Sequence, residues 1–292
     1  MSRHHRHSNL LPMMRIGSHL PAWFWRPVGR LVVAFLTTFP PRHMRQWQLN
    51  YAVMTGHRPS WNTTRRAFGR WVENMMCSLQ LDHWSEKKIR SRVILENPEG
   101  WAGVHRAFQE GGLVAALPHM GSWDLVGAFA CLDGLPVSSV AEALPDGQFE
   151  YFRSLRERLG FRIFSLRYRG VYNKLADDLD EGRVICLVAD RDFSRRGLPV
   201  HWDTPDGPRD QTMPPGPALL AQQGHRPLVG VVTWFGPRHR LHVLVTDLIH
   251  VGSGEQELVR ASQQLADFFS RQISDHPLDW LMLQRFFRGV TA

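Results

Sequence analysis

A histidine and an aspartate separated by four residues, His119 and Asp124, are the first side chains in this sequence whose types and spacing suit catalysis. The apolar run 113–117 before them is typical of a buried strand, and Gly121 marks a turn into a helix whose first turn holds Asp124. On one uninterrupted helix the two side chains would diverge by roughly 140°. Across a strand-to-helix turn they can converge.

This pair predicts a general base with an orienting partner. A carboxylate that accepts a hydrogen bond from one imidazole nitrogen fixes the tautomer, and the other nitrogen can then take a proton from a hydroxyl. We therefore expect His119 to be the base and Asp124 to orient it.

Two further acidic positions follow apolar runs that are typical of strands. Residues 137–141 lead to Glu142, and residues 184–189 lead to Asp190. Strand and helix patterns alternate through this part of the chain, which predicts an α/β fold with a central, mainly parallel sheet and helices on both faces. Sites in such sheets lie beyond the carboxyl ends of the strands, so we expect His119, Glu142 and Asp190 at one rim.

The domain organisation follows from length and pattern. A chain of 292 residues with 43% hydrophobic content is ample for a folded core. We expect a disordered lead-in over residues 1–20 and a single domain over 21–292. Its first part, 21–100, is predicted to be helical, and its second part, 101–292, to be the α/β unit.

A strongly apolar segment begins the predicted domain. Residues 21–39 are too short for a confident membrane span, and Trp23, Trp25, Arg26 and Arg30 stand at their head. Aromatic residues beside arginines suit the headgroup boundary of a membrane, so the segment is suited to lie on a membrane face. A helix packed on the protein's own core explains it equally well, and one helix can do both.

The charge balance predicts anionic partners. The chain has 35 basic and 27 acidic residues, with a formal net charge of +8, and nearly all of the basic residues are arginine. Arginine suits phosphate and carboxylate, which fits nucleic acid, anionic lipid or a phosphorylated cofactor. Scattered arginines and the lack of a known binding motif argue against nucleic acid. The cysteines have no metal or redox spacing, as expected for buried thiols in a reducing cytoplasm.

Four ordered motifs resemble a known group of enzymes. The stretch 117–124, Leu-Pro-His-Met-Gly-Ser-Trp-Asp, is similar to the His-x4-Asp signature of lysophospholipid-type acyltransferases. Its form resembles the branch that holds the bacterial lipid A late acyltransferases and the actinobacterial phosphatidylinositol mannoside acyltransferases. Stretches that resemble the later motifs of that branch are Val140-Ala-Glu142 with the Arg156 to Gly160 element, residues 186–192, and residues 213–218.

The resemblance, which is nearest to the mannoside acyltransferases, implies an acyl-CoA-dependent O-acyltransferase. An acyl group would pass from coenzyme A, or from a carrier-protein thioester, to a mannose hydroxyl of a phosphoinositide glycolipid. The implied protein needs no bound cofactor and is peripheral, at the anionic cytoplasmic face of the cell membrane. The alternative within the family is another lipid acceptor, lipid A-like or a lysophospholipid. The sequence leaves the oligomeric state open.

Roles for the other predicted site residues follow from the resemblance. Asp190 stands where the family tends to carry glutamate, and is expected to hold His119 or the acceptor hydroxyl. Glu142 is expected to fix the acceptor, and Arg156 to bind its phosphate or order the site. Glu142 and Arg156 could instead form a buried ion pair.

Two more substrate-binding residues and an oxyanion site complete the prediction. Ser122 is expected to contact substrate, and Arg191 to bind the donor's phosphates unless it is merely solvated. Backbone N-H groups near Gly121 are expected to face the tetrahedral oxyanion.

A metal-dependent hydrolase is the competing class. His119, Asp124, Asp190 and Asp192 offer an imidazole and carboxylates that could hold a cation. No second histidine stands within a few residues of His119, and Arg191 would oppose a cation if it pointed inward. We therefore predict no metal site.

Overall fold

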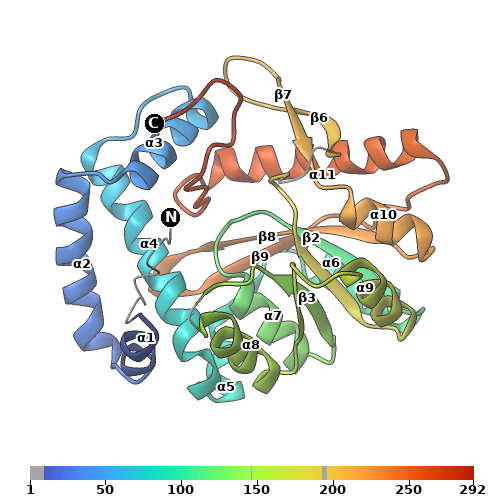
Figure 1. Ribbon diagram of the computed structural model, residues 1–292, viewed down its shortest axis with the longest axis horizontal. Coiled ribbons are helices and arrows are strands. Elements are labelled where there is room, and N and C mark those ends of the chain that lie inside the picture. The colour runs from blue at the N-terminus through green and yellow to red at the C-terminus, as the bar shows by residue number, and fades with distance from the viewer. Residues whose placement is uncertain (1–9, 146, 193–195) are drawn as a thin grey trace, which may run out of the picture.

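The computed structural model describes residues 10–145, 147–192 and 196–292. In this part of the chain, seven strands form one central sheet in the order β1-β9-β8-β2-β5-β3-β4 (Figure 1). Neighbouring strands are parallel except for β8 and β9. The predicted mainly parallel sheet is confirmed. The strands are β1 (Val93–Leu95), β2 (Leu113–Leu117), β3 (Val137–Ala141), β4 (Arg162–Ser165), β5 (Val184–Val188), β8 (Leu228–Phe235) and β9 (Leu241–Val245).

Helices pack against both faces of this sheet, as predicted. The helices before the sheet are α1 (Leu10–Ser18), α2 (Ala22–Thr38), α3 (Arg42–Thr55) and α4 (Trp61–Gln80). Those that alternate with the strands are α5 (Glu86–Arg92), α6 (Pro98–Gln109), α7 (Trp123–Leu132), α8 (Gln148–Arg158), α9 (Val171–Asp180), α10 (Gly216–Gln223) and α11 (Glu255–Asp275). Short 3-10 turns cover Leu81–His83 and Pro237–His239.

Strand β2 lies in the middle of the sheet and is buried on both faces. Its alternate residues divide between two cores, because successive side chains of a strand point to opposite faces. Leu113 and Leu117 pack in the core under α5, α6 and α7. Val114 and Ala116 pack in the core under α9, α10 and α11. A strand held on both faces gives the residue after it, His119, a fixed position.

The N-terminal helices form a third core of their own. Val33 of α2, Trp47 of α3 and Phe68 of α4 meet there. Figure 1 shows α2 at the edge of the molecule, alongside α4, with the sheet on the other side of α4. Helix α2 thus packs on protein with one face, and several of its large apolar residues remain exposed. In the part of the chain described here, no helix has the length and apolarity that a membrane crossing requires.

Two elements differ from the sequence-based prediction. Residues 10–18 form helix α1, where a disordered lead-in was expected; residues 1–9 lie outside the described residues. Strands β6 (Leu198–Trp202) and β7 (Arg209–Met213) form an antiparallel hairpin that was not predicted. The alternation of apolar Leu198, Val200 and Trp202 with Pro199 and His201 was the available signal.

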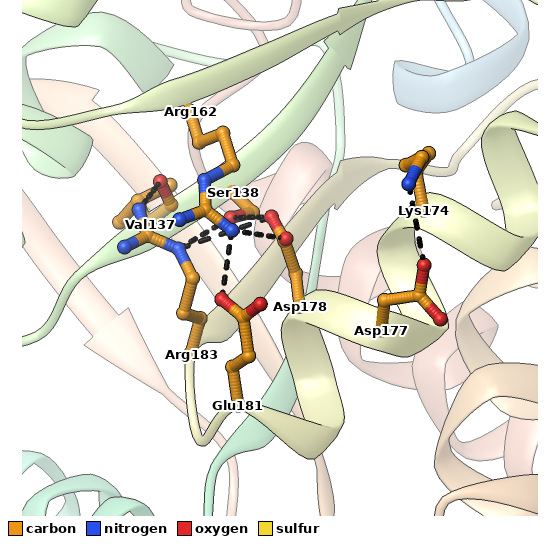
Figure 2. Close-up of polar contacts among 8 residues, drawn as sticks. All are labelled: Val137, Ser138, Arg162, Lys174, Asp177, Asp178, Glu181 and Arg183. Carbon is orange, nitrogen blue, oxygen red and sulfur yellow. Dashed lines mark hydrogen bonds and ion pairs between the residues drawn. The ribbon is translucent and has the colours of Figure 1, made fainter.

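A polar network fixes β3 and β4 at their amino ends, away from the predicted rim (Figure 2). The buried carboxylate of Asp178 on α9 accepts from Ser138 of β3 and from Arg162 of β4. Arg183, which precedes β5, donates to the Ser138 hydroxyl at 2.7 Å and to the Val137 carbonyl at 2.9 Å. The network joins three strands to α9 and therefore holds the sheet in register.

Candidate active site

His119 and Asp190 meet at the carboxyl rim of the sheet. Strands β2 and β5 are parallel neighbours with Leu117 opposite Val188, and each of the two residues follows its strand by two positions. The Nδ1 atom of His119 lies 2.6 Å from Asp190 Oδ1, and the backbone N-H of His119 donates to Asp190 Oδ2 at 3.0 Å. The carboxylate therefore fixes both the ring and the backbone of the histidine.

Asp190 is buried as a hydrogen-bonded anion. Its side chain is 0% exposed, and the indole N-H of Trp280 donates to Oδ2 at 2.9 Å. Burial alone would raise the pKa of Asp190, but the charge of His119 and the hydrogen bonds from His119 and Trp280 lower it overall. A carboxylate in this state stays ionised and accepts a hydrogen bond from the protonated Nδ1 of the imidazole.

The imidazole of His119 is held with one nitrogen available. Burial lowers its pKa, but the neighbouring charge and hydrogen bond of Asp190 outweigh burial and the charge of Arg191, so the pKa lies above its usual value. The side chain is 31% exposed, with the Trp123 ring 6.1 Å away between centroids. No residue in the described ranges hydrogen-bonds Nε2. This nitrogen is placed to take a proton from a bound hydroxyl.

Asp124 has a different partner from the one predicted. Arg156 of α8 donates to both of its carboxylate oxygens, at 2.7 Å and 3.3 Å. Both side chains are mostly buried, and the charge of Asp124 outweighs burial to raise the pKa of Arg156. The expectation that Asp124 orients His119 is therefore corrected: Asp190 contacts His119, and Asp124 ties α7 to α8. The buried ion pair that the sequence left open for Arg156 exists, with Asp124 in place of Glu142.

The backbone around Gly121 is also used differently from the prediction. The N-H groups of residues 119–122 donate to Asp190, to the Pro118 carbonyl, to the Asp279 carbonyl and to the Thr233 hydroxyl. They are not free to face an oxyanion. Gly121 itself has φ +62°, and a Cβ there would lie 2.3 Å from the Thr233 carbonyl oxygen, so the turn accepts only glycine.

A C-terminal segment that was not predicted to enter the site completes it. The Leu281 N-H donates to the His119 carbonyl at 2.9 Å, and Met120 forms an isolated bridge with Trp280. The Trp280 carbonyl accepts from the Trp47 indole at 2.8 Å. Trp280 thus joins the third core to Asp190. The sequence shows a tryptophan after the last helix, but it does not indicate that Trp280 contacts Asp190, 90 positions earlier.

The remaining predicted residues divide between the rim and the interior. Arg191 follows Asp190, and its charge acts on both Asp190 and His119. Glu142 is exposed after β3, the strand next to β5. Ser122 is 0% exposed, and its role as a substrate contact stays a prediction. The rim therefore holds His119, Asp190 and Arg191 together, with Glu142 one strand away.

The residues of the rim do not form a metal-binding arrangement. Over the described ranges, no group of three or more His, Cys, Asp or Glu side chains is placed to hold a metal ion. Asp124, one of the carboxylates that a metal site would need, has both oxygens occupied by Arg156. The geometry fits proton transfer by an imidazole and gives no separate support to a metal-dependent hydrolase.

A comparison with known families agrees with the motifs. Residues 11–289 match the family model described as bacterial lipid A biosynthesis acyltransferase. The chain belongs to this family. The match extends from α1 to the segment after Trp280, so the N-terminal helices and the C-terminal segment are parts of the family domain.

Two similar proteins carry a more specific name. The chain is 37% identical over 177 residues to the phosphatidylinositol mannoside acyltransferase of Mycolicibacterium smegmatis, covering 59% of this chain and 56% of that protein. It is 35% identical over 222 residues to the phosphatidylinositol mannoside acyltransferase of Mycobacterium tuberculosis, covering 75% of this chain and 67% of that protein. The matched part thus spans just over half of the first relative.

Proposed function

We propose that this protein is a lipid O-acyltransferase that moves a long-chain acyl group from acyl-coenzyme A to a mannose hydroxyl of a phosphatidylinositol mannoside-type glycolipid. The observation that carries the proposal is the His119–Asp190 pair, which leaves Nε2 of the imidazole available at the rim of an acyltransferase-family fold. The names of the two relatives support the choice of acceptor.

In the proposed reaction, His119 acts as a general base and then as a general acid. Nε2 takes the proton of the acceptor hydroxyl while the hydroxyl oxygen attacks the thioester carbonyl carbon. The tetrahedral intermediate collapses, the carbon–sulfur bond breaks, and the imidazolium returns the proton to the departing thiolate. The products are the ester and free coenzyme A, and no covalent enzyme intermediate forms. General base catalysis of this kind contributes typically about 10²–10⁴-fold in rate.

Asp190 and Arg191 would support this reaction in different ways. Asp190 holds the Nδ1 proton of His119, so that Nε2 is the basic nitrogen, and its charge stabilises the imidazolium that forms. Arg191 lies close enough to act on the charge of both residues, and we assign it to the phosphates of the donor. Glu142 and the exposed rim after β3 would contact the acceptor.

The proposal includes peripheral attachment at the anionic cytoplasmic face of the membrane. Large apolar side chains remain exposed on α1 and α2, among them Ile16 at 65%, Trp23 at 78%, Leu31 at 72% and Phe35 at 64%. Contiguous exposed apolar surface of this kind is typical of an interaction site, and a helix with one apolar face suits the boundary between headgroups and acyl chains.

The test is to incubate the purified protein with isotopically labelled acyl-coenzyme A species and total membrane lipid, and to identify acylated products by mass spectrometry. A labelled acyl ester on mannose of a phosphoinositide glycolipid is the expected product. Transfer only to lipids without mannose would retain the acyltransferase and refute the mannoside acceptor. Absence of any transfer by a folded, membrane-bound protein would refute the proposal.

A further inference from the structure

A basic cavity of about 340 Å³ lies between α2 and α4, beside the end of β8. Its volume is in the range of small-molecule sites. Its lining includes five arginines, one glutamate, Glu73, and one histidine, His239. The arginines are Arg26 and Arg30 of α2, and Arg65, Arg66 and Arg70 of α4. We call this site the α2–α4 basic cavity.

Two glycines, Gly29 and Gly69, shape the space between α2 and α4 in different ways. A Cβ on Gly29 of α2 would lie 3.0 Å from the Val72 side chain, so this glycine permits the helices to approach. A Cβ on Gly69 of α4 would meet no atom within 4 Å. Glycine is unfavourable in a helix interior. Gly69 therefore keeps open a space that a larger residue would occupy.

The charges around the cavity are not balanced within the protein. Glu73 is shared by Arg26 at 2.8 Å, Arg92 at 3.3 Å and His239 at 3.3 Å. Among the residues that the structure describes, no carboxylate forms an ion pair with Arg30, Arg65 or Arg66. Positive charge therefore exceeds negative charge at this site.

The pKa directions agree with mutual repulsion of these cations. Burial lowers the pKa of Arg70, and the charge of Arg66 lowers it further. The pKa of His239 is lowered by burial first; the charges of Arg26 and Arg30 also lower it, against the opposite effect of Glu73. A bound anion would relieve this repulsion.

Buried donors at the cavity also lack acceptors. Trp25 is only 8% exposed, and its indole N-H has no hydrogen-bond partner among the described residues. The Nε of Arg65 is likewise buried without a partner there. Buried polar groups are almost always satisfied, and the groups left over here are donors. These two donors lie in the wall of the cavity, and the surplus positive charge of its arginines selects an anion.

One residue connects the cavity to the active site. Asp279 accepts from Arg70 and, at 3.0 Å, from the backbone N-H of Phe235, and both of these residues line the cavity. The carbonyl of Asp279 accepts from Gly121, two residues after His119, at 3.0 Å. The wall of the cavity and the turn that carries the base are thus fixed to the same residue.

The position on α2 indicates where the anion comes from. Arg26 and Arg30 lie at the flank of a helix whose outer face exposes Leu31 and Phe35. If that face enters the boundary of the bilayer, arginines at its flank lie at the level of the phosphates.

We propose that the α2–α4 basic cavity binds the phosphodiester of the acceptor lipid's headgroup, an inference that rests on the proposed acyl transfer to a phosphoinositide lipid. Arg30 and Arg66 pair with the phosphodiester oxygens. A lipid anchored there presents the hydroxyls of its headgroup toward His119.

The first test removes charge. Arg30→Gln with Arg66→Gln is compared with Arg106→Gln with Arg271→Gln, which removes the same charge from exposed positions on α6 and α11. Binding is measured to phosphatidylcholine vesicles with and without phosphatidylinositol. Phosphatidylinositol in the vesicles should increase the affinity of the parent protein. We expect this increase to be about tenfold smaller for the cavity variant, which corresponds to ~1.4 kcal/mol, and to be unchanged for the control variant.

The second test fills the cavity without changing charge. Gly69→Leu projects a side chain into the open space, and Gly69→Ala adds only a methyl group. We expect Gly69→Leu to raise the KM for the acceptor lipid about tenfold, again ~1.4 kcal/mol, with the KM for acyl-coenzyme A unchanged. Gly69→Ala is expected to stay close to the parent protein, and neither variant should lower the Tm.

Three other outcomes separate the possibilities. A raised KM for acyl-coenzyme A with unchanged vesicle binding would overturn the proposal and assign the cavity to the donor's phosphates. Equal vesicle binding by all variants would overturn it outright. Loss of phosphatidylinositol-dependent binding in the cavity variants of a protein that acylates no lipid would support the phosphodiester site and refute the proposed function.

Discussion

Asp190 and Asp124, two carboxylates of the sequence motifs, have different partners. Asp190 lies 71 positions away in sequence, yet it contacts both the ring and the backbone of His119. Asp124 lies only five positions after His119 and pairs instead with Arg156. Adjacency of β2 and β5 in the sheet decides the first contact, and the direction of α7 decides the second. Closeness in sequence therefore misidentified the partner of the base.

The two carboxylates also differ in the kind of side chain that each one pairs with. Asp190 is paired with a half-buried imidazole whose second nitrogen is open. Asp124 is paired with a guanidinium, which stays protonated at physiological pH and cannot act as a base. Of the two pairs, only His119 with Asp190 contains a side chain that can gain and lose a proton near neutral pH. Substitutions in the two pairs should consequently affect different measurements.

The largest expected effect is at the base itself. His119→Ala should lower the rate of acyl transfer about 10²–10⁴-fold, because the hydroxyl loses its proton acceptor. A matched control is His105→Ala, since His105 also pairs with a carboxylate, Asp133, at 2.8 Å and has the same 31% side-chain exposure. Transfer of labelled acyl groups and thermal unfolding are the measurements. Full transfer by folded His119→Ala protein would contradict the mechanism.

The next effect is at Asp190. In the proposed mechanism the neutral imidazole of His119 is the base, and Asp190 raises its pKa, so kcat/KM should rise as pH increases through that raised pKa. Asp190→Asn removes the charge, so the rate should fall about 10²-fold. The acidic limb of the pH profile, where kcat/KM rises with pH, should move to lower pH. The pH profile of kcat/KM is the measurement. An unmoved acidic limb would show that Asp190 does not set the pKa of the base.

Asp124→Asn should act on stability instead. It leaves Arg156 buried without its partner, which should lower the free energy of unfolding by about 3–5 kcal/mol. The double variant Asp124→Leu with Arg156→Met should recover much of this loss, because both charges are removed together. Denaturant unfolding measures the change, and the acidic limb of the pH profile should stay in place. A shifted limb would restore Asp124 as a partner of His119.

The smallest effect is expected at Trp280. Trp280→Phe keeps an aromatic ring and removes the indole donor to Asp190. One hydrogen bond to a charged group is lost, which should cost about 1.5–3 kcal/mol of stability and reduce transfer less than Asp190→Asn does. Chemical unfolding and initial rates measure the two changes. Identical stability and rate would mean that the indole contact is incidental.

Much of the architecture was predictable because it is encoded locally. The alternation of apolar runs with helical patterns predicted the central sheet and its flanking helices, and the strands before His119, Glu142 and Asp190 were recognised. The hairpin β6–β7 was missed because a short alternating pattern with a proline in it is a weak signal. Helix α1 was missed because a basic lead-in resembles a disordered segment.

The sequence predicted that His119 and Asp190 lie at one rim, but it did not predict the contact of Trp280 with Asp190 or the partner of Asp124. A carboxyl rim gathers the ends of parallel strands, so His119 and Asp190 could be placed together. The partner of Asp124 depends on where α8 packs, and the burial of Ser122 depends on the turn that Gly121 makes against Thr233. Such contacts arise between segments distant in sequence, and no spacing within one motif encodes them.

The contact between Trp280 and Asp190 sets an order of events during synthesis. The ribosome makes all seven strands of the central sheet before it reaches the segment that carries Asp279 and Trp280. Until that segment docks, Asp190 lacks its indole donor and the turn at Gly121 lacks its carbonyl partner. The environment of His119 and Asp190 is therefore complete only after residues 279–281 have been synthesised and packed against the turn at Gly121.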